Sequence, residues 1–341
     1  MGNYKKIEMS GIKDKRILFF APAFFGYELK IKAKMEEMGA VVDFYDERSV
    51  KKAASRALLK ISSDIFEYKS KRYYSNIIEK HKNQTYDYIF VVKCDMMTES
   101  ILQDLHIAFP KAMFCLYLWD SVKNIKGVTD KFKYFDRVLT FDRQDAVKYP
   151  VMKFRPLFYA DEFRLELNKD NDYKYDISFC GTIHSDRYKI IRKIIDYCRQ
   201  YKLKYFTFCY LQSKFIYHFY KITKPEFSKT KESDFSFAKM SSRNISDVVK
   251  KSRVILDVQH PNQMGLTMRT IEMLGMNKKL ITTNPEIKKY DFYNPNNILV
   301  VDRKNIQIPH TFFKSKYTAL SDDIFEKYSI ESWIKDILVN I

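Results

Sequence analysis

Two kinds of hydrophobic spacing alternate along the chain: short continuous apolar runs, and longer stretches with an apolar residue every three or four positions. The runs are typical of strands buried on both faces of a parallel sheet, and the longer stretches are typical of helices that cover such a sheet. In the first half we expect strands at residues 16–20, 41–45, 88–92, 113–118 and 137–140, and helices at residues 28–38, 70–82 and 98–108. This order predicts a doubly wound α/β domain.

The same alternation begins again after a break. Pro150, Pro156 and the polar stretch LNKDNDYKYD separate the two halves. Beyond them we expect strands at 177–180, 203–209, 254–258 and from Leu280, helices at 187–200 and from Met268, and an amphipathic helix in the tail SIESWIKDILVNI. The 341 residues are enough for two cores. We therefore predict domains at residues 1–156 and 172–328, followed by a terminal helix at 329–341.

The stretch from Arg253 to Asn284 runs from a strand through a glycine-bearing loop into a helix, and it carries the strongest candidate site. His260, Gly265, Thr267, Arg269 and Glu272 follow the strand. The carboxyl ends of parallel strands are where open α/β sheets bind ligands. Gly265 would let a diphosphate approach the amides at the helix start, and Arg269 would contact its oxygens. Glu272, on the same helical face, would accept hydrogen bonds from a ribose.

An alternative for the last two residues is equally compatible with their spacing. Arg269 and Glu272 stand three apart, as in an ordinary ion pair on a helix surface. Neither G-x-G-x-x-G nor G-x-x-x-x-G-K-[ST] occurs, which argues against a dinucleotide site and against P-loop chemistry. The pattern therefore favours a nucleoside diphosphate with its sugar.

A second loop of the same half adds candidates. Gly181 ends the apolar run ISFCG and begins a loop, and Arg187 opens the next helix, where it would contact the same diphosphate. A tight turn with a solvent-facing arginine is the alternative. His260 would touch the transferred sugar or the base, although a lone histidine is more often a structural group.

The first half offers a candidate general base. Asp120 follows the run MFCLYLW, where it would take the proton of an acceptor hydroxyl, and a helix N-cap accounts for it about as well. Gly26 and Tyr27 lie in the loop after the first strand, where they would contact the acceptor or a donor phosphate. A glycine there also suits a simple turn.

The net charge of +18 indicates an anionic partner, which could be nucleic acid, an anionic membrane face or a polyanionic substrate. Basic and aromatic residues interleave between Tyr201 and Lys231, and no RNA-binding signature is present, so we prefer the membrane surface over nucleic acid. A solvated, lysine-rich face is the alternative. With no signal peptide and no apolar stretch long enough to cross a bilayer, we expect a cytoplasmic protein, peripheral at the inner membrane face.

Metal and disulfide chemistry are not expected. The five cysteines form no C-x-x-C pair and stand mostly beside apolar residues, so we expect them to be reduced and buried. The six histidines are scattered, without H-E-x-x-H. We expect neither a metal nor another cofactor.

Three segments together resemble a known family: RILFFAPAFFGYELKIKAKMEEMGAVVDFYDER, LYLWDS with FKYFDRVLTFDRQDA, and GLTMRTIEMLGMNKKLITTNPEIKKYDFYNPNNILVVDR. The chain is similar to bacterial GT-B glycosyltransferases, of the family-1-like and spore-maturation-protein-like kind found in capsule and lipopolysaccharide gene clusters. The resemblance implies two Rossmann-like domains facing across a cleft. The first would bind the acceptor, the second a nucleotide sugar, and the C-terminal helix would cross back to the first.

The resemblance also implies a mechanism without an obligatory metal, in which Arg187, Arg269 and helix amides meet the charge of the leaving diphosphate. One position departs from the pattern. Retaining members of related families carry a glutamate eight residues before the ribose-binding one, and Met264 stands there, so retention of configuration is not implied. We predict a glycosyltransferase acting on a surface polysaccharide or lipid-linked glycan. The alternatives are a polyol-phosphate transferase, a sugar-nucleotide epimerase or a non-catalytic nucleic-acid-binding protein.

Overall fold

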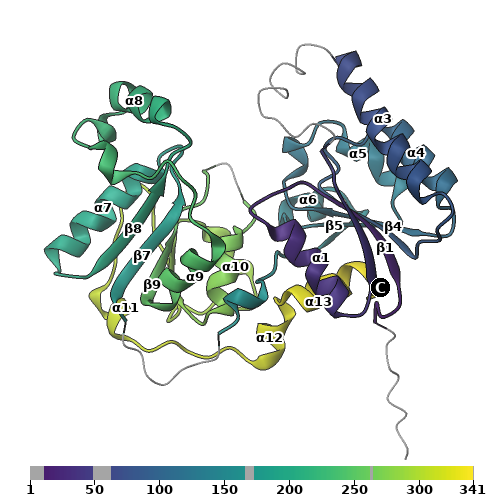
Figure 1. The fold of residues 1–341 in the computed structure, drawn as a ribbon. Coiled ribbons are helices and arrows are strands. Elements are labelled where there is room, and N and C mark those ends of the chain that lie inside the picture. Colours follow the sequence, from purple (N-terminus) through teal and green to yellow (C-terminus); the bar gives the residue numbers. More distant parts are fainter. Residues whose placement is uncertain (1–10, 49–62, 166–172, 262–263, 341) are drawn as a thin grey trace, which may run out of the picture. The chain divides into compact units, whose positions relative to one another are not determined.

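The computed structural model describes residues 11–48, 63–165, 173–261 and 264–340. Contacts divide the chain into two units, each built on its own parallel sheet (Figure 1). The first unit comprises Met1–Pro156 and Ile330–Ile341, and the second comprises Leu157–Ser329. Each unit is described by itself below.

The sheet of the first unit has the strand order β2-β1-β3-β4-β5-β6, and every neighbouring pair is parallel. Its strands are β1 (Arg16–Ala21), β2 (Val41–Asp46), β3 (Tyr88–Val92), β4 (Met113–Leu118), β5 (Arg137–Thr140) and β6 (Met152–Phe154). Its helices are α1 (Tyr27–Glu37), α3 (Ser63–His81), α4 (Glu99–Ala108), α5 (Val128–Lys131), α6 (Arg143–Lys148) and α13 (Ile330–Leu338). The chain adds β2 on one side of β1 and β3 on the other, so the topological switch lies between β1 and β3.

Alternate residues of β1 fill two apolar layers, as the period of two in a strand requires. Leu18 and Phe20 pack in the layer that α3, α4 and α5 cover, whereas Phe19 stacks on Phe90 in the other layer, with ring centroids 5.0 Å apart. Figure 1 shows α1 and α13 on that second face. Both faces of the sheet are therefore covered, as an all-parallel sheet requires.

The C-terminal helix α13 packs on the first unit. Trp333 is fully buried, and its ring meets Tyr117 edge-on at 4.7 Å. Asp336 forms an ion pair of 2.6 Å with Nε of Arg155, and Nη1 of Arg137 donates a hydrogen bond of 3.1 Å to the carbonyl of Ile337. The chain thus leaves the first unit after Pro156 and returns to it at its end.

The sheet of the second unit has the order β11-β10-β9-β7-β8, again all parallel. Its strands are β7 (Tyr175–Thr182), β8 (Tyr205–Tyr210), β9 (Ser252–Asp257), β10 (Lys279–Thr282) and β11 (Ile298–Val300). Its helices are α7 (Arg187–Gln200), α8 (Lys214–Thr223), α9 (Ser242–Lys250), α10 (Met268–Gly275), α11 (His310–Lys314) and α12 (Asp322–Lys327). The predicted fold class, α/β with two Rossmann-like units, is confirmed.

Two further expectations concern the chemistry of the chain. All five cysteines are free and buried, as predicted from their apolar neighbours. Within the described ranges, no helix combines the length and the apolar character that crossing a bilayer demands.

Candidate functional site

The second sheet has its topological switch between β7 and β9. The chain adds β8 on one side of β7, then crosses to β9 and continues outward through β10 to β11. The loops that leave β7 and β9 therefore start side by side at the carboxyl edge of the sheet, where ligands of doubly wound folds bind.

Two histidines show that these loops meet. The rings of His184, after β7, and His260, after β9, lie 5.3 Å apart between centroids. Burial lowers the pKa of His184 to about 4, and the positive charges of Arg187 and His260 contribute. His184 is therefore neutral at physiological pH and offers a hydrogen-bond donor and an acceptor, while the exposed His260 faces solvent.

Arg187, the first residue of α7, turns its side chain back toward the end of β7. Its Nη1 donates a 2.6 Å hydrogen bond to the carbonyl of Thr182, and its Nε is buried and finds no hydrogen-bond partner in the described part of the chain. Burial lowers the pKa of Arg187, while the nearby Asp257 raises it. The alternative of a solvent-facing arginine is wrong, because this guanidinium is directed into the protein at the switch point.

Gly181 lies within β7, paired with Cys209, and not in the following loop as we had expected. The strand runs one residue further because Thr182 still pairs with Tyr210. A Cβ at position 181 would stand 3.0 Å from the ring of Phe179 and 3.6 Å from Nη1 of Arg187. The glycine therefore leaves room chiefly for the ring of Phe179, since a Cβ would be in ordinary van der Waals contact with the arginine.

The start of α10 is held by a carboxylate that the sequence did not single out. Thr267 is the N-cap, and its Oγ1 accepts a 3.2 Å hydrogen bond from the amide of Thr270. Asp257, the buried last residue of β9, accepts hydrogen bonds from the hydroxyls of both threonines, at 3.2 and 2.9 Å. The buried Gly265 lies just before this cap. Strand β9 thus fixes where the amides of α10 begin.

Arg269 and Glu272 form an ion pair of 2.6 Å, and it is not a surface pair. The side chain of Glu272 is 1% exposed and that of Arg269 is 18% exposed, with its guanidinium 6.0 Å from the ring of Phe163. The partly exposed arginine covers the buried glutamate. Glu272 therefore orients Arg269 in this structure, and a ribose would meet the carboxylate only if the arginine moved aside.

A third arginine, Arg303, connects the loops that follow three strands. Nη1 of Arg303, after β11, contacts both carboxylate oxygens of Asp186 at 2.7 and 2.9 Å, and its Nη2 donates a 2.5 Å hydrogen bond to the carbonyl of Gln259. Asn284, after β10, donates a 3.2 Å hydrogen bond to the carbonyl of Met264. These contacts order the loops, while Arg187 and Arg269 supply the cationic groups beside them.

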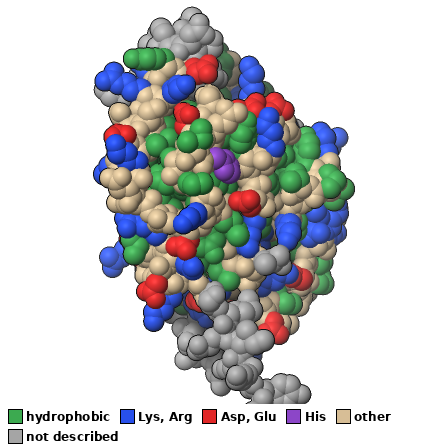
Figure 2. Space-filling view, turned by 90° about the vertical axis from the view of Figure 1, so that its right-hand side faces the viewer, with side chains coloured by type: hydrophobic (Ala, Val, Ile, Leu, Met, Phe, Trp, Pro, Cys, Tyr) green, Lys and Arg blue, Asp and Glu red, His purple; other side chains and the backbone are tan. Residues whose placement is uncertain are grey.

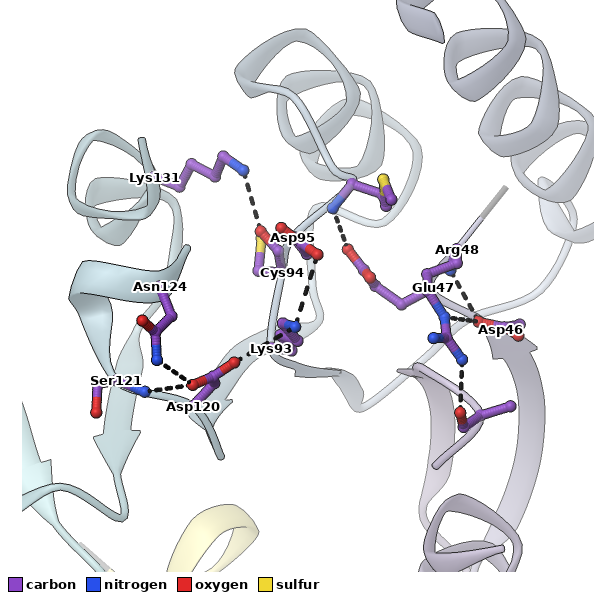
Figure 3. Close-up of polar contacts among 12 residues, drawn as sticks. Asp46, Glu47, Arg48, Lys93, Cys94, Asp95, Asp120, Ser121, Asn124 and Lys131 are labelled. Carbon is purple, nitrogen blue, oxygen red and sulfur yellow. Dashed lines mark hydrogen bonds and ion pairs between the residues drawn. The ribbon is translucent and has the colours of Figure 1, made fainter. Parts of the chain in front are cut away.

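The first unit gathers charged residues at its own strand ends (Figure 3). Asp120, after β4, accepts hydrogen bonds at Oδ1 from the amide of Ser121 (3.0 Å) and the side chain of Asn124 (2.7 Å). Its Oδ2 lies 3.5 Å from Nζ of Lys93, which is also 3.6 Å from Asp95. Asp120 thus orders the turn after β4, and its partly exposed side chain also lies beside a lysine.

Glu47 is a second carboxyl group at this edge that sequence reasoning missed. It follows β2 and is fully buried, with Oε1 accepting a 2.5 Å hydrogen bond from the amide of Met96. Its Oε2 is buried without a hydrogen-bond partner among the described residues. Burial, with a smaller contribution from the charge of Asp95, raises the pKa of Glu47 to about 8, so the group is protonated at neutral pH.

The structure separates the roles of Gly26 and Tyr27. Gly26 is the N-cap of α1 with φ +81°, and a Cβ there would meet nothing within 4 Å. Backbone conformation, not crowding, therefore accounts for this glycine. Tyr27 is only 7% exposed, and Nζ of Lys30 lies 4.6 Å from its ring centroid. The exposed groups of this loop are instead Phe24 and Phe25.

Within the described ranges, no three His, Cys, Asp or Glu side chains lie close enough together to hold a metal ion.

Neither a protein-family model nor a curated protein matches this chain. Solved structures do. The α,α-trehalose-phosphate synthase (UDP-forming) of Burkholderia xenovorans, in complex with glucose-6-phosphate, aligns over 96% of this chain and 99% of its own, with TM-score 0.63 and 10% identity. Sucrose-phosphate synthase of Thermosynechococcus elongatus aligns over 95% of both chains, with TM-score 0.55 and 10% identity.

HepE of Anabaena, in complex with UDP and glucose, aligns over 95% of this chain and 94% of its own, with TM-score 0.54 and 10% identity. These proteins are GT-B glycosyltransferases. The chain has their two-sheet α/β fold, and the likeness extends over nearly its whole length.

Proposed function

We propose that the protein is a glycosyltransferase that moves a sugar from a nucleotide-sugar donor to a surface polysaccharide or a lipid-linked glycan. One observation carries the proposal: the guanidinium of Arg187, whose Nε is buried, lies at the switch point of the second sheet, beside His184 and the loop that carries His260. A preorganised cation at this edge suits an anionic ligand, and the GT-B fold makes a nucleoside diphosphate the leading choice.

The donor diphosphate would bind at the carboxyl edge of the second sheet. Arg187 and Arg269 would supply charge-assisted hydrogen bonds, and the amides around Gly265 and Thr267 would supply the positive end of α10. Glu272 would hold Arg269 in place and reach the ribose once the arginine engages phosphate. His260 would contact the sugar or the base. All these ligands come from protein groups, so we propose a reaction that needs no metal and no further cofactor.

In the reaction, the acceptor oxygen would bond to the anomeric carbon while the bond from that carbon to the diphosphate breaks. The nucleoside diphosphate leaves with the bonding electrons, and the arginines stabilise its added charge. The acceptor proton would pass to the carboxylate of Asp120, whose side chain is partly exposed at the strand ends of the first unit. Gly26 and Tyr27 would shape the acceptor loop. We also propose a cytoplasmic enzyme, peripheral at an anionic membrane face, because a lipid-linked acceptor would lie at a membrane and the chain is basic.

Calorimetric titration with a panel of nucleoside diphosphates tests the donor part. We expect wild type to bind at least one of them, and we expect Arg187→Ala and Arg269→Ala each to weaken that binding by about ten- to a hundredfold, because each removes a charge-assisted hydrogen bond of about 1.5–3 kcal/mol. Arg199→Ala, at the exposed far end of α7, is the matched control and should bind like wild type. The proposal fails if wild type binds none of the panel but binds oligonucleotides with a steep salt dependence.

A further inference from the structure

Helix α8 carries apolar side chains on two opposite faces. Its inner face packs into the unit: Tyr217 is 2% exposed, with its ring 5.4 Å from that of Phe235. The outer face does not pack. Phe215, Phe219 and Ile222 are 79%, 54% and 86% exposed. At 100° per residue these three fall within about 60° of one another, so they form one exposed stripe, called here the α8 stripe.

The surroundings of the stripe are basic. Between Lys214 and Asp234 the sequence holds five lysines and three acidic residues, Glu226, Glu232 and Asp234. Glu232 pairs with Lys214 at 2.9 Å, so the remaining lysines supply the net positive charge. Figure 1 shows α8 beyond the end of β8, apart from the helices that cover the sheet. On the face that Figure 2 displays, by contrast, lysine and arginine side chains are spread among acidic ones. The combination of an apolar stripe and nearby lysines is what distinguishes α8 from the generally basic surface.

We propose that the α8 stripe inserts into the interface of an anionic lipid bilayer, with the neighbouring lysines on the headgroups. An interfacial helix needs an apolar face beside Lys or Arg, and each lysine near an anionic surface strengthens binding about fivefold. This inference adds the contacting element to the membrane location proposed above, and it does not depend on the transfer reaction.

A second copy of the chain fits the stripe less well. Three side chains of this size bury at most roughly 600 Å², whereas a stable dimer buries about 800 Å² on each partner. The lysines around the stripe would also repel their counterparts in a symmetric pair. A bilayer needs no matching surface and supplies the opposite charge.

Contacts within the unit place α8 close to the proposed donor loops. Nζ of Lys224, one residue past the helix, donates a 3.0 Å hydrogen bond to the carbonyl of Ser185 in the loop after β7. Ser213 caps the other end of α8 and accepts a 3.3 Å hydrogen bond from the amide of Ile216. A membrane under α8 would therefore lie beside the edge of the sheet that carries Arg187.

Liposome flotation tests the inference, with vesicles of phosphatidylcholine alone or mixed with phosphatidylglycerol. Wild type should float with the anionic vesicles only, and Phe215→Ser/Ile222→Ser should lower its partition coefficient at least tenfold. Ile107→Ser/Val147→Ser, which alters two residues of α4 and α6 that are 79% and 81% exposed, is the matched control and should float like wild type.

The inference is overturned if the stripe variant floats as well as wild type, or if wild type shows no preference for anionic vesicles. It is also overturned if sedimentation detects a wild-type dimer that the stripe variant loses while flotation is unchanged. Measuring nucleoside diphosphate binding by the same proteins tests the proposed function separately, because the stripe variant keeps every residue assigned to the donor site.

Discussion

Glu47 and Arg187 show how burial, rather than residue type, gives a single side chain its chemistry. Glu47 is protonated at neutral pH because no water reaches it and only one of its oxygens has a donor. Burial lowers the pKa of Arg187 and the nearby Asp257 raises it, while its Nη1 donates a hydrogen bond to the carbonyl of Thr182. Such perturbed groups at strand ends are where we expect function.

Replacing Glu47 with glutamine should change how stability depends on pH. The folded-state pKa of about 8 lies above the ordinary 4.5, so the folded protein holds a proton that the unfolded chain releases. That stability is present below pH 4.5 and is lost as the pH rises toward 8. Between pH 5 and pH 9, wild type should lose about 4 kcal/mol of unfolding free energy relative to Glu47→Gln.

Urea unfolding at both pH values, followed by circular dichroism, measures this difference. Glu79→Gln, which alters a mostly exposed glutamate of α3, should track wild type at both pH values. Equal pH dependence in wild type and Glu47→Gln would show that Glu47 ionises normally in the folded protein.

At the residue scale, the sequence identified those side chains whose role follows from their position relative to a predicted helix or strand. Thr267 was recognised as a polar residue just before a helical stripe, and it is the N-cap of α10. Asp257 and Glu47 were not recognised, because each ends or follows a strand like many other acidic residues. Their importance comes from partners distant in sequence: the hydroxyl of Thr270 for Asp257, and the amide of Met96 for Glu47.

At the element scale, the strands were predicted best because a short continuous apolar run, bounded by polar residues, suits a strand buried on both faces and not a surface helix. Helix α8 was missed for a physical reason. Its apolar residues face both inward, at Tyr217, and outward, at Phe215 and Ile222, so the polar residues occupy only a narrow side of the helix. The three-residue strand β6 was missed because MKF alternates over too short a length.

One glycine controls how α10 docks. A Cβ at Gly275 would lie 2.6 Å from the carbonyl oxygen of Phe163 and 2.5 Å from the ring of Tyr159. Backbone cannot give way as a flexible side chain can, so Gly275→Ala should lower the unfolding free energy by about 2–3 kcal/mol. Gly11→Ala, at a glycine with open space around it, should stay within about 1 kcal/mol of wild type.

Chemical denaturation of the three proteins under one condition gives the comparison. A Gly275→Ala protein as stable as Gly11→Ala would mean that α10 does not rest directly on the segment around Phe163.

At the scale of the whole molecule, the fold class was predictable because two rounds of strand–helix alternation leave few architectures other than two parallel sheets. The return of α13 to the first unit had a weaker basis in the sequence, since an amphipathic tail shows only that one face is buried. Trp333 now identifies the surface: it packs against Tyr117 and Phe90 of the first sheet. Function follows less directly, because one fold supports many chemistries and the site must be argued from its own groups.

The most direct test is a crystal structure with the nucleoside diphosphate that binds tightest. We predict that its diphosphate lies at the carboxyl edge of the second sheet, within hydrogen-bond distance of Arg187 and of the first amides of α10, with Arg269 turned toward phosphate. A diphosphate bound elsewhere on the chain, with Arg187 still directed at Thr182 and Arg269 still covering Glu272, would contradict the proposed donor site.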